Sequence, residues 1–253
     1  MPAHYARYAR YLIGTQRTAE SNQELGFVLA FVAGAINAGG FLAVKQYTSH
    51  VTGMVSSLAD NLALGQLGLV VDAAVGVLSF LLGAMCCAIM VNFARRRQLS
   101  SEYALPLLLE AGLILCFGLL GAKLSTFEGL LIPFTVVLLC FIMGLQNAIA
   151  TKLSHAVIRT THMTGIVTDL GIELGKLVYW NGKSNHPLKV RADRKRMAIL
   201  TGLLAAFTFG GVAGAYGFKQ VGYGFTVPLA LVLAVLALVP TVDDLLRHRK
   251  TGP

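Results

Sequence analysis

The sequence predicts an all-α polytopic membrane protein with six transmembrane helices and two re-entrant or broken half-helices, arranged as a 3+3 inverted-topology repeat. Three observations support this prediction: an apolar composition, six apolar runs of membrane-spanning length, and a polar hexapeptide that occurs twice. Hydrophobic residues make up 55% of the 253 residues and charged residues only 13%, whereas soluble domains are about 25% charged. The mean hydropathy is +0.67, so lipid must be the solvent for most of the chain.

The N-terminal segment, residues 1–24, is basic and aromatic. It lacks the short apolar core and the small-residue cleavage site of a secretory signal peptide. Tyr5, Tyr8 and Tyr11 are spaced by three, with Arg7 and Arg10 between them. This pattern fits either a short helix at the level of the lipid headgroups or a disordered basic tail.

Six apolar runs are long enough to cross a bilayer, which takes about 20 residues. They fall at 25–44, 67–93, 104–122, 129–150, 197–218 and 223–240. Two further helix-like stretches, 50–65 and 162–178, are shorter and carry carboxylates. We therefore expect these two stretches to enter the membrane without crossing it.

The basic residues predict the orientation, because Lys and Arg accumulate in cytoplasmic segments. We place the N-terminus in the cytoplasm and let each short stretch return to the side from which it came. Of the 21 Lys and Arg, only Lys45, Lys123 and Lys219 then lie outside. Both termini are cytoplasmic in this arrangement, and residues 241–253 form a basic tail. The basic loop 183–196 is expected to contact anionic lipid rather than nucleic acid.

The hexapeptide TSHVTG at 48–53 recurs as TTHMTG at 160–165. It belongs to a longer repeat, with one copy at 25–123 and the other at 129–240. Because each copy holds three spans, the second copy enters the membrane from the opposite side, as in many secondary transporters and some channels. The first match pairs Asn37-Ala38 with Asn147-Ala148. Seven further matches share one register and pair, in order, Thr48, His50, Thr52, Gly53, Val55, Leu58 and Leu62 with Thr160, His162, Thr164, Gly165, Val167, Leu170 and Leu174. Weaker matches pair Phe80, Gly83 and Ala88 with Phe207, Gly210 and Ala215, and Pro106-Leu107 with Pro228-Leu229.

Each hexapeptide is expected to begin a half-helix deep in the membrane, where the first backbone N–H groups lack intrahelical partners. Ser49 and Thr161 are the expected N-caps, with Thr48 and Thr160 as alternates. We also expect the first span to break at Gly39–Gly40, Gly53 and Gly165 to admit a neighbouring helix, and Asn37 and Asn147 to satisfy the broken backbone.

Two helix N-termini that face each other near the midplane favour an anion or a polar acceptor. Capping does not require His50 or His162, so each either contacts such a group, exchanges a proton near neutral pH, or bonds a carbonyl as a structural residue. We predict that both histidines lie within reach of one shared cavity. The candidates for solute binding or proton coupling are His50, His162, Asn37, Asn147, Thr52, Thr164, Ser49, Thr161, Glu110, Asp60, Asp169 and Glu173.

Two acidic residues lie inside apolar runs, at different expected depths in the membrane. Glu110 lies in the middle of a span, where a carboxylate is a functional candidate, although it could instead pair with an Asn or His across the bundle. Asp72 is expected near the outer interface and is not among the candidates.

These features favour a permease, meaning a secondary transporter or facilitator, for a small polar or anionic solute held near the midplane between the two half-helix N-termini. The alternative is a channel-like or structural membrane protein without coupled transport. No dinucleotide fingerprint, Walker loop or nucleophile–base set is present, so neither an enzyme nor a cofactor is expected.

The remaining partner predictions concern metals, lipid and other copies of the chain. The four cysteines lie in apolar runs without metal-site spacing, so we expect core residues and no metal site. The lipid bilayer is the expected partner. The glycines at 210–217 are spaced to pack an oligomer, and they suit packing within one chain equally well.

The motifs GAINAGGF, TSHVTGMVSSLADNLALG, GLQNA and RTTHMTGIVTDLGIELGK resemble those of the YoaK-like family of bacterial multi-span inner-membrane proteins. The resemblance covers residues 25–240 and leaves the N-terminal segment outside. It implies a location in the bacterial inner membrane and a multi-pass fold. The family has no assigned activity, so it supplies neither a solute nor site residues.

Overall fold

The structure is a computed structural model that describes residues 11–14, 18–123, 128–153, 161–181 and 189–250. These residues form helices and loops, with no strand among them. Two helices are short, α3 (Val51–Ala63) and α7 (Met163–Val178). The long helices are α2 (Ala19–Val44), α4 (Leu67–Arg96), α5 (Ala104–Lys123), α6 (Glu128–Leu153), α8 (Arg194–Gln220) and α9 (Thr226–Lys250), which follows the 3₁₀ turn η1 (Gly222–Phe225).

Within the part of the chain that the structure describes, six segments are long and apolar enough to cross a membrane, and they overlap the six predicted spans. Most of the helices extend beyond the predicted spans, and local bonds are found at two of these ends. The expected loop 183–196 ends early: Asp193 caps α8 by accepting from the backbone N–H of Arg196 at 3.0 Å, so Arg194 to Arg196 are helical. The expected tail at 241–253 continues α9 as far as Lys250. There Asp244 accepts from the backbone N–H of Ser100 at 2.7 Å.

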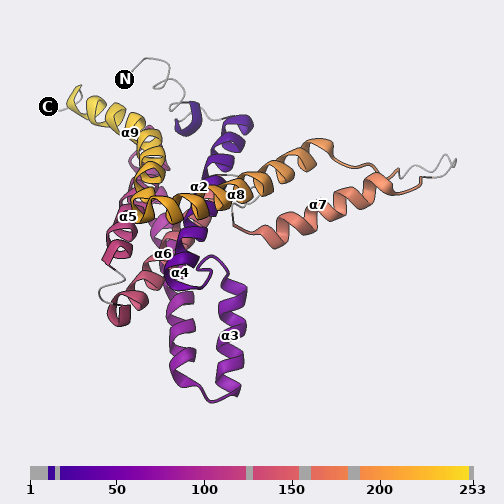
Figure 1. Ribbon diagram of the computed structural model, residues 1–253. Coiled ribbons are helices and arrows are strands. Elements are labelled where there is room, and N and C mark those ends of the chain that lie inside the picture. Colours follow the sequence, from indigo (N-terminus) through magenta and orange to yellow (C-terminus); the bar gives the residue numbers. More distant parts are fainter. Residues whose placement is uncertain (1–10, 15–17, 124–127, 154–160, 182–188, 251–253) are drawn as a thin grey trace.

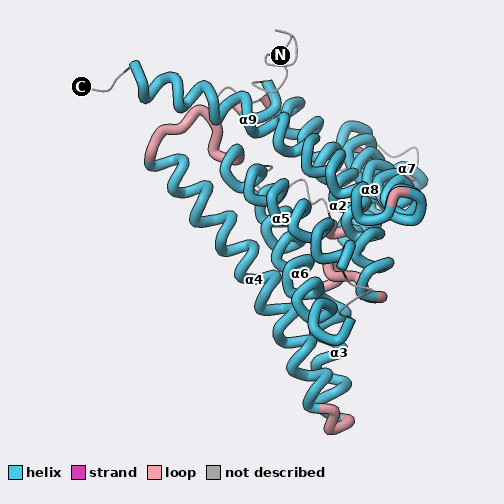
Figure 2. The backbone as a smooth tube through the Cα atoms, turned by 60° about the vertical axis from the view of Figure 1, so that its left-hand side comes forward, coloured by secondary structure: helices cyan, strands magenta, loops and turns pink. Residues whose placement is uncertain are grey.

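The two short helices pack beside the first halves of long ones. Figures 1 and 2 show α3 alongside α4 in one hairpin and α7 alongside α8 in another, and the hairpins project in different directions. Tyr5, Tyr8, the alternate cap Thr160 and residues 183–188 of the basic loop lie outside the described residues. For Tyr5 and Tyr8 the structure therefore tests neither the helix at the lipid headgroups nor the disordered basic tail.

Helices α2 and α8 cross where glycine on each lies against a carbonyl of the other. A Cβ on Gly34 would stand 2.1 Å from the carbonyl oxygen of Phe207, and one on Gly210 would stand 2.0 Å from that of Phe31. Gly214 meets the carbonyl of Ala35 in the same way. The glycine series at 210–217 thus serves packing within the chain, which is how small residues act in membrane helices.

Helices α4 and α6 cross in the same manner. A Cβ on Gly83 would stand 2.1 Å from the carbonyl oxygen of Phe141, and one on Gly144 would stand 1.9 Å from that of Phe80. The weak sequence echo that pairs Phe80 and Gly83 with Phe207 and Gly210 therefore marks corresponding contacts at the two crossings. These crossings bring α2, α4, α6 and α8 together.

The expected break at Gly39–Gly40 is wrong, because α2 continues without interruption to Val44. The two glycines make room for neighbours instead. A Cβ on Gly39 would stand 2.3 Å from the ring of Phe218, and one on Gly40 would stand 3.1 Å from Leu139. The chain turns only after α2 ends, at Lys45, which is in the left-handed conformation with φ 57°.

Helices α5 and α9 complete the core through aromatic packing at η1. The rings of Phe117 and Tyr223 meet edge to face at 5.8 Å, and Phe218 and Phe225 extend the cluster. Cys87 and Cys140 are buried as expected, whereas Cys116 is exposed on α5.

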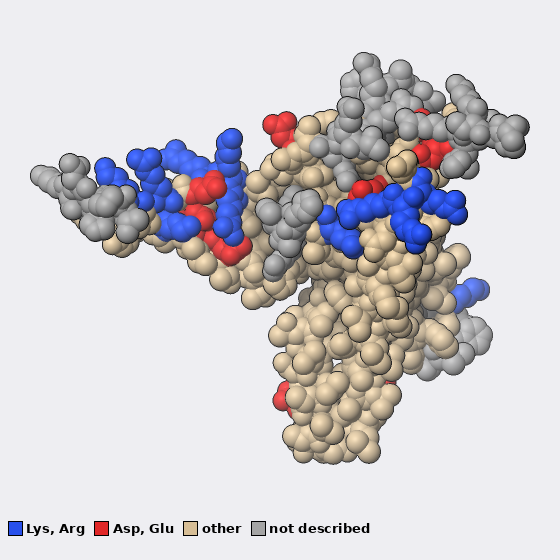
Figure 3. All heavy atoms as spheres, turned by 180° about the vertical axis from the view of Figure 1, so that it is seen from behind, with Lys and Arg blue, Asp and Glu red and all other residues tan. Residues whose placement is uncertain are grey.

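The positive charge is unevenly distributed. On the face in Figure 3, Lys and Arg lie over the projecting α7–α8 hairpin and close to the end of the molecule that holds the chain termini. The α3–α4 hairpin shows none on that face, and residues 51–94 contain no Lys or Arg at all.

Replacing Gly144 with alanine tests the glycine crossing. The added methyl group would overlap the Phe80 carbonyl, so α4 and α6 must move apart, and such overpacking costs about 1–3 kcal/mol. We expect a lower thermal unfolding temperature for Gly144→Ala in detergent. Gly171→Ala is the control, because Gly171 is an exposed position in α7 with open space around it; a helical Ala is better there by up to about 1 kcal/mol. Equal stability of the Gly144 variant and the wild type would contradict this account.

Candidate functional site

The two hexapeptides fold into turns of nearly identical geometry. His50 is the N-cap residue of α3 with φ −93° and ψ 69°, and His162 is the N-cap residue of α7 with φ −83° and ψ 57°. Neither side chain makes a capping hydrogen bond. The same sequence thus produces the same turn before each short helix.

The predicted N-caps, Ser49 and Thr161, are wrong because each residue lies one position before the cap. The Ser49 hydroxyl donates instead to Oδ1 of Asn37 at 2.8 Å, and the Thr161 hydroxyl donates to Oδ1 of Asn147. Thr48, the alternate cap, is buried just before this turn. Each hydroxyl therefore ties its turn to the preceding long helix.

The expected role of Asn37 and Asn147 in satisfying a broken backbone is also wrong. Their Oδ1 atoms accept from the hexapeptide hydroxyls, while the Asn147 amide donates within α6 to the Met143 carbonyl at 2.8 Å. The two asparagines act as tethers for the turns that lead into α3 and α7.

The glycine of each hexapeptide makes room for its own histidine rather than for another helix. A Cβ on Gly53 would stand 2.6 Å from Nδ1 of His50, and one on Gly165 would stand 2.7 Å from Nδ1 of His162. Each imidazole thus folds back over the first helical turn. This contact explains why the His-x-x-Gly spacing occurs in both copies.

The remaining polar candidates on the short helices fall into two groups. Thr52, Thr164 and Asp60 are exposed. Asp169 and Glu173 lie in an ion-pair cluster on the α7–α8 hairpin. Asp169 pairs with Arg196 at 2.9 Å, and Glu173 pairs with Lys176 at 2.8 Å.

Glu173 is the centre of this cluster, which holds α7 against α8. Its side chain is only 2% exposed, and its second oxygen accepts from the backbone N–H of Asp193 at 2.9 Å. The hydrogen bond from Lys176 and that from the Asp193 backbone lower the pKa of Glu173 below its ordinary value. The bonds favour the carboxylate, so the contact is strongest when Glu173 is ionised.

Glu110 lies within α5 and is fully buried. Among the described residues neither of its carboxyl oxygens has a hydrogen-bond partner, so the alternative in which Glu110 pairs with an Asn or His is not seen there. Gln146, on α6, is buried as well and donates to the Leu29 carbonyl at 3.1 Å.

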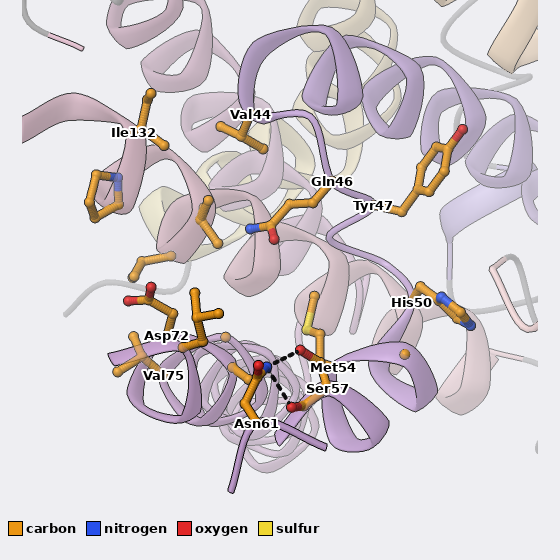
Figure 4. Close-up of a pocket in the computed structure, with 17 residues that line it drawn as sticks. Val44, Gln46, Tyr47, His50, Met54, Ser57, Asn61, Asp72, Val75 and Ile132 are labelled. Atoms are coloured by element: carbon orange, nitrogen blue, oxygen red, sulfur yellow. Dashed lines mark hydrogen bonds between the residues drawn. The ribbon is translucent and has the colours of Figure 1, made fainter. Parts of the chain in front are cut away.

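A pocket of about 640 Å³ lies between the end of α2, the α3–α4 hairpin and the beginning of α6. Its polar lining is Gln46, Tyr47, His50, Ser57, Asn61 and Asp72, and its apolar lining includes Met54, Ala73, Gly76 and Ile132. In Figure 4 the Gln46 amide and the Asp72 carboxylate face the space between α4 and α6, and His50 lies at the edge. Asn61 donates to the carbonyl of Ser57 at 2.7 Å and to its hydroxyl at 2.9 Å.

The pocket contains His50 but not His162. It is therefore not the shared cavity that the sequence predicts. Sequence reasoning also missed Gln46, Ser57 and Asn61 and set aside Asp72. One signal was present: Gly53, Ser57 and Asn61 recur at intervals of four and so share one face of a helix. Nothing in the local sequence indicated that residues of α4 and α6 would line the same pocket.

The fold and its six span-length helices define a multi-pass membrane protein. Over residues 25–239 the chain matches the family described as "Protein of unknown function (DUF1275)", and it belongs to that family. This family includes the YoaK-like proteins, so the resemblance seen in the motifs is confirmed. No match was found among curated proteins or among solved structures.

The pKa of Glu173 predicts a pH dependence for the α7–α8 contact. The folded-state pKa is lowered, so the contact stabilises the protein above the ordinary value of 4.5 and is lost as the pH falls through the folded-state value. We expect Glu173→Gln to unfold at a lower temperature than the wild type at pH 7, with a gap that narrows as the pH approaches 4 and below. Thermal unfolding in detergent measures this gap, and a gap that does not change with pH would exclude the ionised contact.

Proposed function

We propose that the protein is a permease for a small polar solute, built from two inverted halves. Helices α2 to α5 form one half and α6 to α9 the other. The short helices α3 and α7 are half-helices that begin within the membrane. The pocket beside α3 is the solute site, and both termini lie in the cytoplasm of a bacterial cell.

The observation that carries this proposal is the paired geometry of the two halves. The same His-x-x-Gly turn and the same hydroxyl-to-asparagine tether occur once in each half. The same glycine crossing occurs twice between the halves, where α2 meets α8 and where α4 meets α6. A half of three spans that is repeated must run in the opposite direction in its second copy. Inverted repeats with interrupted helices and a site near them are typical of secondary transporters.

The chemistry of the pocket supports a polar solute. Two amides, two hydroxyl-bearing side chains, a carboxylate and an imidazole line it together with apolar side chains. A volume of about 640 Å³ is within the range of small-molecule sites. The Asp72 carboxylate opposes a simple anion, so of the two solute classes that the sequence favours we propose the polar one.

The inverted arrangement can be tested by cysteine labelling. The loop that holds Gln66 joins α3 to α4, and Lys189 lies in the segment between α7 and α8. In a variant without Cys86, Cys87, Cys116 and Cys140, we expect an impermeant maleimide to label Gln66→Cys in intact cells and Lys189→Cys only after permeabilisation. Arg97→Cys is the control and should behave as Lys189→Cys does. Labelling of both loops from the same side would refute the inverted repeat.

Transport can be tested in proteoliposomes with amino acids, organic cations, organic acids and polyols. We expect saturable uptake of at least one class. Loss of one or two hydrogen bonds, each contributing about 0.5–1.5 kcal/mol, should lower uptake about tenfold at subsaturating solute in Gln46→Ala or Asn61→Ala. Gly171→Ala, on α7, should transport normally. Flux that does not saturate would favour a channel, and no flux from folded protein would favour a structural role.

A further inference from the structure

The position in the second half that corresponds to the pocket is filled. Two alignments relate the halves. The alignment of α3 with α7 that pairs Gly53 with Gly165 also pairs Met54 with Ile166. A second alignment, of α4 with α8, pairs Gly83 with Gly210. By this register Ala73 corresponds to Leu200 and Gly76 to Leu203. Ile166, Leu200 and Leu203 form a buried apolar cluster. Small residues thus line the pocket where leucines close the corresponding space.

The polar residues of the pocket also differ from their counterparts. Asp72 corresponds to Ile199, which packs against the same apolar cluster. Ser57 and Asn61 correspond to Asp169 and Glu173. Asp169 closes α7 onto α8 through its ion pair with Arg196, and Glu173 does so by accepting from the backbone N–H of Asp193. In the first half, the counterpart of Arg196 is Leu69, which lines the pocket. Among the described residues, no ion pair closes α3 onto α4 at that point.

The charge around the pocket has one sign. No Lys or Arg lines it, and Asp72 has no hydrogen-bond or ion-pair partner among the described residues. Lys45 is close in sequence, but it is not among the lining residues. A carboxylate in a partly apolar pocket attracts an opposite charge more strongly than one in bulk water. The amide oxygens of Gln46 and Asn61 are further acceptors for a donor-rich group.

We propose that this pocket binds a small organic cation that carries an ammonium group, with Asp72 as its counter-charge, and that the corresponding α7–α8 position is not a second site. This proposal rests on the proposed function and specifies its substrate class. The first half contains the site because Asp72, Ala73 and Gly76 leave the pocket between α3 and α4 unfilled. The second half is held shut by its leucines and its ion pairs.

Binding to the purified full-length protein in detergent tests the proposal without a transport assay. The cationic probes are ethanolamine and choline at neutral pH and constant ionic strength. The matched neutral probe is 3,3-dimethylbutan-1-ol, which has the shape of choline without its charge, and acetate is the anionic probe. A ligand that binds only the folded state raises the unfolding temperature. We expect at least one ammonium probe to raise it by about 2 °C or more and the other two probes to have no effect.

Two variants locate the bound cation. Asp72→Asn removes the counter-charge, and Gly76→Leu introduces the residue that fills the second half. We expect each to weaken ammonium binding at least about tenfold. Glu20→Gln, an exposed carboxylate in the first turn of α2, is the charge control. Gly68→Leu, an exposed position on α4 with open space around it, is the volume control, and both controls should bind as the wild type does.

The outcomes separate this proposal from the proposed function. Binding of the neutral alcohol or of acetate that is lost in Gly76→Leu but kept in Asp72→Asn would overturn the cation class and leave the pocket as a solute site. No ammonium binding by folded wild-type protein would overturn the proposal, whatever the uptake assay shows. Ammonium binding that survives in both variants would place the cation elsewhere and overturn it as well.

Discussion

The close approach of backbones at two helix crossings is the constraint on which the rest of the structure depends. Membrane helices gain little from burying apolar side chains against each other, because lipid is equally apolar, so close packing must hold them together. Gly34 and Gly210 provide this contact between α2 and α8, and Gly83 and Gly144 provide it between α4 and α6. Each crossing lies near the middle of its long helices. The other half of α4 and of α8 is thus left free to pair with a short helix.

The second level of organisation is the turn that begins each short helix. A hydroxyl bonded to an asparagine on the preceding long helix sets where the turn lies, and the glycine leaves space for the imidazole over the first helical turn. Asparagine, hydroxyl residue, histidine and glycine are thus one structural unit, which occurs twice. Structural demands explain most of the repeated motif, and most of the polar side chains that line the pocket lie outside it.

The two halves share this framework but differ in how their hairpins close. The α7–α8 hairpin is held by a buried Glu173 and by leucines of one apolar cluster. The α3–α4 hairpin has a pocket at the corresponding place, with Asp72 and Gly76 in its wall. A repeated framework that keeps its crossings and turns can change a few side chains on one hairpin without loss of the fold.

The sequence by itself determined the class of protein, the six spans and the two short helices, because hydropathy and helical length follow from local composition. It also pointed to the repeated turn, since seven matched positions in one register, Thr48 to Leu62 against Thr160 to Leu174, are a local signal. Only the tertiary structure decided what Gly39, Gly53, Asn37 and Ser49 contact, since their partners are chosen by packing and not by spacing. It alone brought Gln46, Asp72 and Ile132 around one pocket, because a cavity between three helices depends on which side chains leave space unfilled.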